Sequence, residues 1–124
     1  MTLANHTPIS LLPTTDYARA RAFFEGVLGL PWREDGPYAS VYGLQGGSLR
    51  VTKVEAFVPH PFAVLGWQVT DIHSTVKELT AKGATFERYA FLEQDALGIW
   101  ASPGAQVAWF KDPDGNTLSL TQMG

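Results

Sequence analysis

The sequence predicts an α+β fold in which one βαβββ unit occurs twice. Two stretches of seven residues, 9–15 and 64–70, have an extended-strand pattern, and each ends in a Thr followed by an Asp. Because Asp is a favoured N-cap residue, a helix is expected to begin at Asp16 and again at Asp71. Three strand-like stretches follow each helix. A tandem pattern in a chain of 124 residues favours a duplicated topology over a generic α+β meander.

The first unit is expected to span residues 1–54, with its helix at 16–28. One apolar stripe marks the buried face of this helix: Ala20, Phe23, Phe24, Val27 and Leu28. Gly29 and Pro31 are expected to end the helix. Strands are expected at residues 30–34, 38–44 and 48–54, with Gly46 and Gly47 as the turn between the last two.

A linker at residues 55–62, kept extended by its two prolines, is expected to lead to the second unit at 63–124, and both units form a single domain. The helix is expected at 72–82, where Ile72, Val76 and Leu79 form the apolar stripe. Strands are expected at 84–89, at Trp100 together with 107–110, and at 117–121. Residues 112–116, Asp-Pro-Asp-Gly-Asn, have the chemistry of a tight hairpin turn.

Composition excludes several classes of function. The net charge of −3 argues against a nucleic-acid partner, because phosphate binding needs a basic surface. The absence of cysteine excludes disulfides, Cys-zinc sites, iron–sulfur clusters and thiol catalysis. No apolar run approaches the roughly 20 residues that cross a bilayer, so no membrane partner is expected. The first residues lack the plan of a signal peptide, and a cytoplasmic location is the expectation.

Two segments give the chain its resemblance to a known family. Residues 23–30, FFEGVLGL, and 110–116, FKDPDGN, resemble the vicinal oxygen chelate superfamily of glyoxalase I, extradiol dioxygenases, fosfomycin-resistance enzymes and bleomycin-resistance proteins. The resemblance covers nearly the whole chain, but these motifs report cap and turn chemistry and not a reaction. It implies that the sheets of the two units form a cup, with the helices outside and a ligand on the inner face.

The resemblance also implies where metal ligands would stand. Metal-dependent members use a His on the first strand and a Glu on the last strand of each unit, and these positions carry Ile9, Arg50, Val64 and Ser119 here. None offers an imidazole or a carboxylate, and a guanidinium would repel a cation. The histidines His6, His60 and His73 show no metal-ligand spacing among themselves. We therefore expect no metal and no other cofactor, which argues against glyoxalase, dioxygenase and fosfomycin-transferase chemistry by the usual route.

Strand alternation and the resemblance together select the candidate ligand-binding residues: Arg50, Gln68, Trp100, Trp109, Ser119, Tyr42 and His60. Trp100 and Trp109 fit a ligand wall and a hydrophobic core equally well. Arg50 on an inner face needs an anion, either a ligand or an internal partner such as Glu55, Glu93 or Asp95. For acid–base catalysis the candidates are Glu93, Asp95, His60, Tyr38 and Tyr42, and no pair is singled out.

The leading hypothesis is a metal-independent small-molecule-binding protein of the bleomycin-resistance type, which sequesters an aromatic or anionic compound and so confers antibiotic resistance. The alternative is an enzyme of the same superfamily (a lyase, an isomerase or a dioxygenase-like protein) with non-standard or absent metal ligands. A third reading is a partner of another protein. A homodimer is expected from the resemblance. The long segment 88–99, which carries Tyr89, Phe91 and Leu92, is interpreted as a lid or, more conservatively, as a dimer contact.

Overall fold

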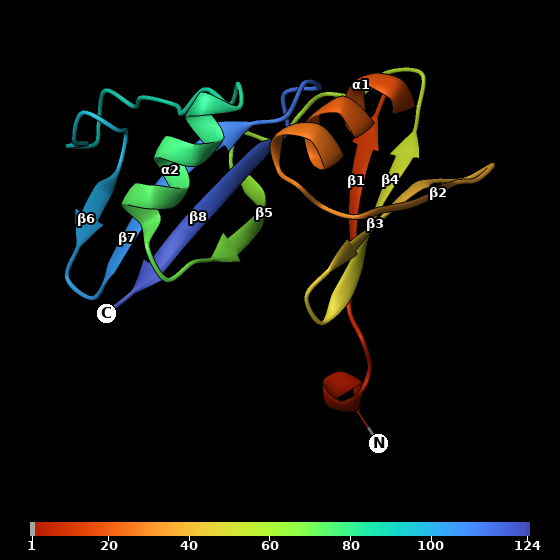
Figure 1. Cartoon of the computed structure of the whole chain (residues 1–124), viewed down its shortest axis with the longest axis horizontal. Coiled ribbons are helices and arrows are strands. Elements are labelled where there is room, and N and C mark those ends of the chain that lie inside the picture. Colours follow the sequence, from red (N-terminus) through yellow and green to blue (C-terminus); the bar gives the residue numbers. More distant parts are fainter. Residues whose placement is uncertain (1) are drawn as a thin grey trace. The chain divides into compact units, whose positions relative to one another are not determined.

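The computed structural model describes residues 2–124 and shows two four-stranded mixed sheets (Figure 1). The chain divides into two compact units, unit 1 up to Phe57 and unit 2 from Val58 to Gly124, and each is described by itself. Both units have the order βαβββ, and the α+β fold predicted from the sequence is confirmed. A short 3-10 helix, η1 (Leu3–Asn5), precedes the first strand.

Unit 1 contains β1 (Ile9–Thr14), α1 (Tyr17–Arg21), its π-helical continuation η2 (Ala22–Val27), β2 (Trp32–Asp35), β3 (Ser40–Leu44) and β4 (Gly47–Lys53). The sheet order is β1-β4-β3-β2, in which β1 is parallel to β4 and the other pairs are antiparallel. The turn between β3 and β4 lies at residues 45 and 46, one position before the predicted pair of glycines.

The predicted cap opens the helix of unit 1. One carboxylate oxygen of Asp16 accepts the backbone N–H groups of Ala18 at 2.9 Å and of Arg19 at 3.2 Å. The helix ends at Gly29, whose φ of 73° is the left-handed conformation that glycine adopts without strain. The start and the end of this helix therefore follow from local chemistry, as the sequence predicts.

The helix covers one face of the sheet of unit 1, and the largest buried side chains lie there: Phe24, Tyr42, Leu49 and Val51. The rings of Phe24 and Tyr42 are 5.6 Å apart. The opposite face, which we call the far face of unit 1, carries Arg50 opposite Leu11 on β1 and Val41 on β3. The alternation of apolar and polar residues on β4 is thus confirmed.

Gly47, the first residue of β4, allows the chain before β1 to pass close by. A Cβ atom added at this position would lie 2.6 Å from the carbonyl oxygen of Pro8. We expect Gly47→Ala to lower the free energy of unfolding by about 1–3 kcal/mol, because either the Pro8 carbonyl or the backbone of β4 must shift to make room for the new Cβ atom. Urea denaturation measures this loss.

Gly26→Ala is the matched control for Gly47→Ala. Gly26 lies in η2, and a Cβ atom there would meet nothing within 4 Å. Since Ala is favoured over Gly in a helix by about 1 kcal/mol, this variant should be as stable as the wild type or more so. Equal stability of the two variants would contradict the steric argument at Gly47.

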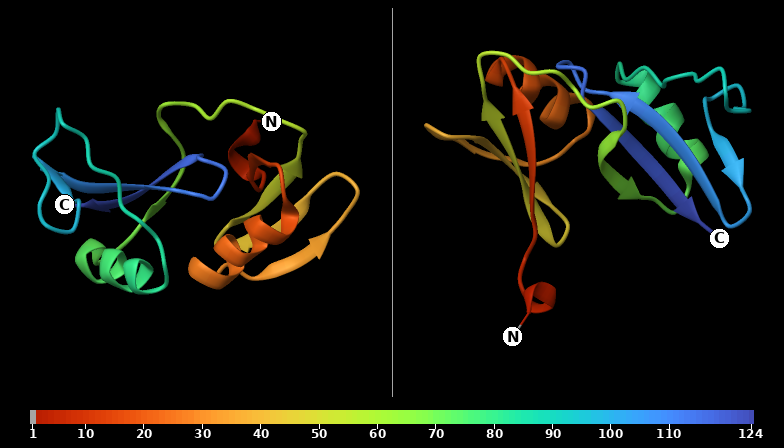
Figure 2. Two further views of the ribbon diagram at one scale, coloured as in Figure 1. Left: turned by 90° about the horizontal axis from the view of Figure 1, so that it is seen from above. Right: turned by 180° about the vertical axis from the view of Figure 1, so that it is seen from behind.

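Unit 2 contains β5 (Ala63–Gln68), α2 (Ile72–Ala81), β6 (Trp100–Ser102), β7 (Ala105–Lys111) and β8 (Thr117–Met123). The sheet order is β5-β8-β7-β6, with β5 parallel to β8 and the other pairs antiparallel. In each unit the helix lies on one face of its own sheet (Figures 1 and 2).

The second helix also begins at its predicted cap. The Asp71 carboxylate accepts the backbone N–H of Ser74 at 3.1 Å and its hydroxyl at 2.9 Å. The Gln122 side chain of β8 accepts the N–H of Ile72 at 2.8 Å, which ties the start of α2 to the sheet. The stripe of Ile72, Val76 and Leu79 is buried together with Ala108, Phe110, Leu118 and Leu120 of β7 and β8. Within residues 2–124, no helix combines the length and apolar character needed to cross a membrane.

The predicted strand at residues 84–89 is wrong. Only Phe86 forms an isolated bridge, to Phe110, and the N–H of Glu87 donates to the carbonyl of Trp109 at 2.8 Å. Trp100 instead opens the separate short strand β6, which pairs with the first part of β7 through residues 105–107. Because β6 pairs with residues 105–107, only the last residues of β7 are available on this edge to pair with Phe86 and Glu87. The chain then leaves the sheet as a loop.

Candidate functional site

The hairpin turn between β7 and β8 sets the register of the site. One carboxylate oxygen of Asp112 accepts the N–H groups of Asp114 at 3.0 Å and Asn116 at 2.8 Å, and the other accepts the Asn116 side-chain amide at 2.8 Å. Asp112 is buried, and burial raises the pKa of its carboxyl. The turn brings β8 back along β7 so that Ser119 pairs with Trp109.

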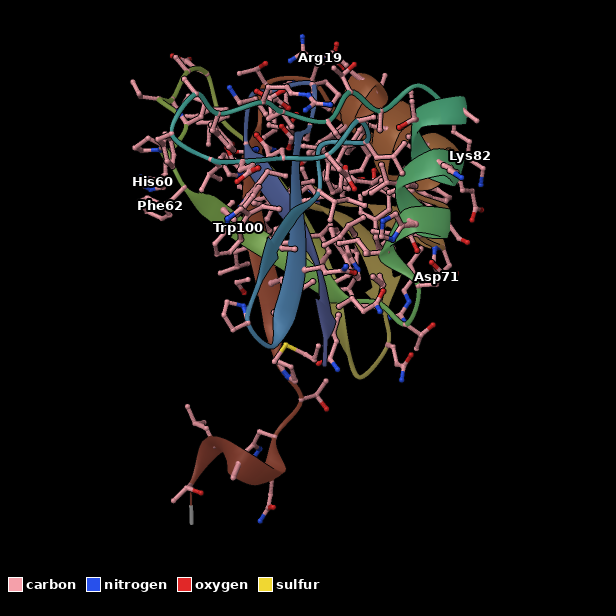
Figure 3. The ribbon with its side chains drawn as sticks, turned by 90° about the vertical axis from the view of Figure 1, so that its left-hand side faces the viewer. Arg19, His60, Phe62, Asp71, Lys82 and Trp100 are labelled. Atoms are coloured by element: carbon pink, nitrogen blue, oxygen red, sulfur yellow. The ribbon has the colours of Figure 1, made fainter. Side chains whose placement is uncertain are left out.

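The far face of unit 2 is the face of its sheet turned away from α2. Strand pairing places Gly66, Ser119 and Trp109 in one row across this face, and Gln68, Thr121, Val107 and Trp100 in the next row. Figure 3 shows Trp100 on the opposite side of unit 2 from α2, the side on which His60 and Phe62 also lie. Residues from four strands therefore share one surface.

Four aromatic rings stand in contact at this surface, and we call them the aromatic row. Trp100 and Trp109 have centroids 6.2 Å apart, and Tyr89 meets Trp109 at 5.6 Å with an interplanar angle of 78°. Phe91 continues the row, 5.6 Å from Tyr89. Trp100 and Trp109 belong to strands, whereas Tyr89 and Phe91 come from the loop after α2. The edge-to-face pair of Tyr89 and Trp109 is a favourable arrangement of aromatic rings.

Two small residues stand in the same row as Trp109, and we call them the Gly66–Ser119 pair. Gly66 of β5 pairs with Ser119 of β8, and a Cβ atom on Gly66 would lie 2.5 Å from the Ser119 hydroxyl oxygen. The hydroxyl therefore occupies the space that a side chain at position 66 would take. This row of the far face thus carries a hydroxyl group and an indole ring.

Side-chain hydrogen bonds to the backbone hold the loop that carries Tyr89 and Phe91. The Gln94 amide accepts the N–H of Tyr89 at 2.8 Å and donates to the carbonyls of Glu87 at 3.0 Å and Gly98 at 2.8 Å. Asp95 accepts the N–H groups of Leu97 and Ile99, both at 2.9 Å. The loop is thus an ordered part of unit 2. Burial raises the pKa of the Tyr89 hydroxyl, so this group keeps its proton at neutral pH.

A cleft of about 440 Å³ lies where this loop meets β6. Its lining includes Glu93 and Asp95 of the loop, Trp100 and Ala101 of β6, and Gln106 of β7. His73 of α2 approaches Asp95, with 3.5 Å between the imidazole and carboxylate atoms. The cleft is a concave surface at the β6 edge, and Trp100 forms part of its lining.

The structure brings together four of the seven residues predicted from the sequence. Gln68, Trp100, Trp109 and Ser119 share the far face of unit 2. His60 also belongs to unit 2, where its ring stacks on Phe62 at 5.0 Å (Figure 3). Arg50 lies on the far face of unit 1, so its part in a site stays a prediction.

The prediction for Tyr42 needs correction. Its side chain has no exposed surface, packs against Phe24 beneath the helix of unit 1, and accepts a hydrogen bond from the Ser40 hydroxyl at 3.2 Å. The cause is strand pairing: Tyr42 lies opposite Leu49, which places it on the helix-covered face.

Tyr89 and Phe91 were not among the predicted ligand-binding residues. The only signal for them is an apolar, aromatic loop too long for a simple connection.

The residues at the family's metal positions do not fit a metal. Ile9 and Val64 offer hydrocarbon side chains, and Arg50 carries a positive charge. Ser119 offers a neutral hydroxyl, a poorer ligand than a carboxylate. Among residues 2–124, no three His, Cys, Asp or Glu side chains gather where they could hold an ion. What the far face of unit 2 presents is aromatic rings, a few neutral polar groups and the Lys111–Glu87 ion pair.

Comparisons with known proteins agree with this fold. The family model of the Glyoxalase/Bleomycin resistance protein/Dioxygenase superfamily matches residues 4–120. A glyoxalase family protein from Bacillus anthracis is similar with a TM-score of 0.77 and 14% identity, covering 100% of this chain and 99% of that one. TnmS3, an antibiotic-binding protein from Streptomyces sp. CB03234, gives a TM-score of 0.76 and 19% identity, covering 100% of both chains.

A third solved structure, the fosfomycin resistance protein FosX from Listeria monocytogenes, gives a TM-score of 0.72 and 12% identity over 94% of this chain and 92% of that one. The search of curated proteins found no match. At these identities the solved structures show the fold, and the family model covers most of the sequence. The chain belongs to the Glyoxalase/Bleomycin resistance protein/Dioxygenase superfamily.

Proposed function

We propose that the protein binds a small aromatic molecule, without a metal, on the far face of unit 2. The observation that carries this proposal is the aromatic row, whose Trp109 shares a strand-pairing row with the Gly66–Ser119 pair. Apolar rings with a small number of polar groups are the usual lining of small-molecule sites. The hydroxyl of Ser119 and the amide of Gln68 are the groups that would orient the ligand.

The chemistry of this surface favours holding a ligand over transforming it. The carboxylate of Glu87 is engaged with Lys111 at 3.5 Å, and the Tyr89 hydroxyl, with its raised pKa, is a poor base at neutral pH. Two similar structures are named as an antibiotic-binding protein and a resistance protein. We therefore propose sequestration of a compound as the biological role.

Equilibrium dialysis against 2-naphthol tests the proposal, because this probe is flat, aromatic and neutral at pH 7. Saturable binding is expected, with the probe recovered chemically unchanged. Conversion of the probe would favour the enzyme alternative. Absence of saturable binding to any flat aromatic probe would contradict the proposal.

Gly66→Val is expected to weaken 2-naphthol binding about tenfold or more, because the new side chain must displace the Ser119 hydroxyl that would orient the ligand. Dialysis with the purified variant gives the ratio of dissociation constants. Gly104→Ala is the control: Gly104 lies in the β6–β7 turn with φ of 96° and no atom within 4 Å of an added Cβ. It perturbs the backbone of the same sheet without touching the Gly66–Ser119 pair. Equal weakening in both variants would show that this pair has no special part in binding.

A further inference from the structure

We propose that the loop at residues 87–99 is half of the binding surface, and that the preferred ligand is a planar compound of several fused rings with little net charge. This inference rests on the proposed function and specifies its ligand class. Tyr89 and Phe91, which the loop contributes, would be ligand-contacting residues in addition to Trp100 and Trp109.

The geometry of the row selects an extended ligand. Tyr89 stands nearly perpendicular to Trp109, with 78° between the ring planes, so the two rings offer surfaces of different orientation. Phe91 contacts Tyr89, and Trp100 contacts Trp109, so the four rings form one continuous chain of contacts. A single six-membered ring covers one position of this row. A fused system of several rings reaches two or more positions and gains face and edge contacts together.

The exposure of Phe91 also favours a ligand that covers more than one ring of the row. Its side chain is 81% exposed, although the loop around it is ordered. Leaving an apolar ring in water forgoes the gain from burial, and a ligand that covers it recovers about 25 cal/mol for each Å² removed from water. The neighbouring Tyr89 hydroxyl keeps its proton and offers a hydrogen-bond donor at this end of the row.

The loop presents these rings before any ligand arrives. Gln94 bonds the backbone on both sides of Phe91, at residues 87, 89 and 98, and Asp95 closes the turn that follows. A surface already in its binding conformation loses less entropy on association. Gln94 is therefore a positioning residue, which acts on the ligand through Tyr89 and Phe91.

The charges beside the row favour a neutral ligand. Lys111 and Glu87 lie 3.5 Å apart and offset each other next to Trp109 and Tyr89. Separating this pair to bind a charged ring would leave one of the two charges without its partner. The test therefore uses uncharged aromatic probes.

The test compares phenol, 2-naphthol and 1-hydroxypyrene, which carry one, two and four fused rings and the same hydroxyl. Dissociation constants are measured by saturation-transfer NMR for phenol and by fluorescence titration for the other two. For the wild type we expect each added ring to tighten binding. Phe91→Ala and Tyr89→Ala should each weaken 1-hydroxypyrene about three- to tenfold, the size of one aromatic contact, and change phenol less than twofold.

Two further variants separate contact from positioning. Gln94→Ala should weaken 1-hydroxypyrene and leave phenol unchanged, because it loosens the loop without removing a ring. Tyr38→Ala removes a ring that is 77% exposed in unit 1 and should change neither probe. Thermal unfolding of each variant confirms that the protein is folded.

The possible failures are distinguishable. If 1-hydroxypyrene binds no more tightly than phenol, or binds Phe91→Ala as tightly as the wild type, the loop is not part of the site and the inference is wrong. Binding that still depends on Trp109 would then uphold the proposed function. If Phe91→Ala only turns a dimer into a monomer by sedimentation, with probe affinities unchanged, Phe91 belongs to a protein interface and the inference is likewise overturned.

Discussion

Trp109→Ala is expected to weaken 2-naphthol binding by roughly 30-fold, or about 2 kcal/mol, the size of a central aromatic contact in a binding site. Trp109 links the strand and loop parts of the aromatic row, because it contacts both Trp100 and Tyr89. Its loss removes the indole face and leaves both neighbours without their partner. Equilibrium dialysis measures the change in dissociation constant.

Trp67→Phe is the matched control for this experiment. Trp67 lies in the same sheet but on the α2 side, where its ring stacks on Phe110 at 6.5 Å. This variant should lose some stability and keep its affinity for 2-naphthol. Trp109→Phe, which retains an aromatic ring, should recover part of the binding. Undiminished affinity in Trp109→Ala would place the ligand elsewhere on the protein.

Asp112→Ala should lower the free energy of unfolding by about 2–4 kcal/mol, one of the largest stability effects expected of a single substitution here. The change removes three hydrogen bonds inside the β7–β8 turn. Two of these bonds come from the N–H and the side-chain amide of Asn116, which is buried. An unsatisfied buried donor costs more than the net value of the bond that it lost. Urea denaturation gives the difference directly.

Glu78→Ala is the matched control for Asp112→Ala. Glu78 also accepts a hydrogen bond from a side chain, Lys82 at 3.4 Å, but its side chain is 67% exposed on α2. Exposed ion pairs contribute about 0–1 kcal/mol, so this variant should unfold almost as the wild type does. Similar losses in the two variants would contradict the view that burial makes the Asp112 turn important.

Local chemistry explains why so much of the fold could be predicted. Asp16 and Asp71 cap their helices through bonds to residues two or three positions away, and such bonds depend on the sequence nearby. Alternation within a strand predicted that Leu118 and Leu120 face the helix while Ser119 faces the other way. Trp109, Ser119 and Gln68 meet on one face for the same reason.

The errors arose where a distant pairing decides the outcome. Tyr42 is buried because β3 lies beside β4 in a register that sets it opposite Leu49. Residues 84–89 form no strand because β6 already pairs with residues 105–107 of the β7 edge, which leaves only its last part. Tyr89 contacts Trp109, and Phe91 contacts Tyr89, in a loop whose Gln94 side chain joins backbone groups at 87, 89 and 98. None of these partners is visible in the local pattern of residues.

The strict alternation on β8 has a consequence for how the surface of unit 2 can vary. Ser119 stands between Leu118 and Leu120, so a far-face residue and two core residues are neighbours in the chain yet lie on opposite faces. A substitution at Ser119 therefore changes the far face and leaves the packing against α2 intact. The chemistry of this face and the stability of unit 2 can thus be varied independently, one residue at a time.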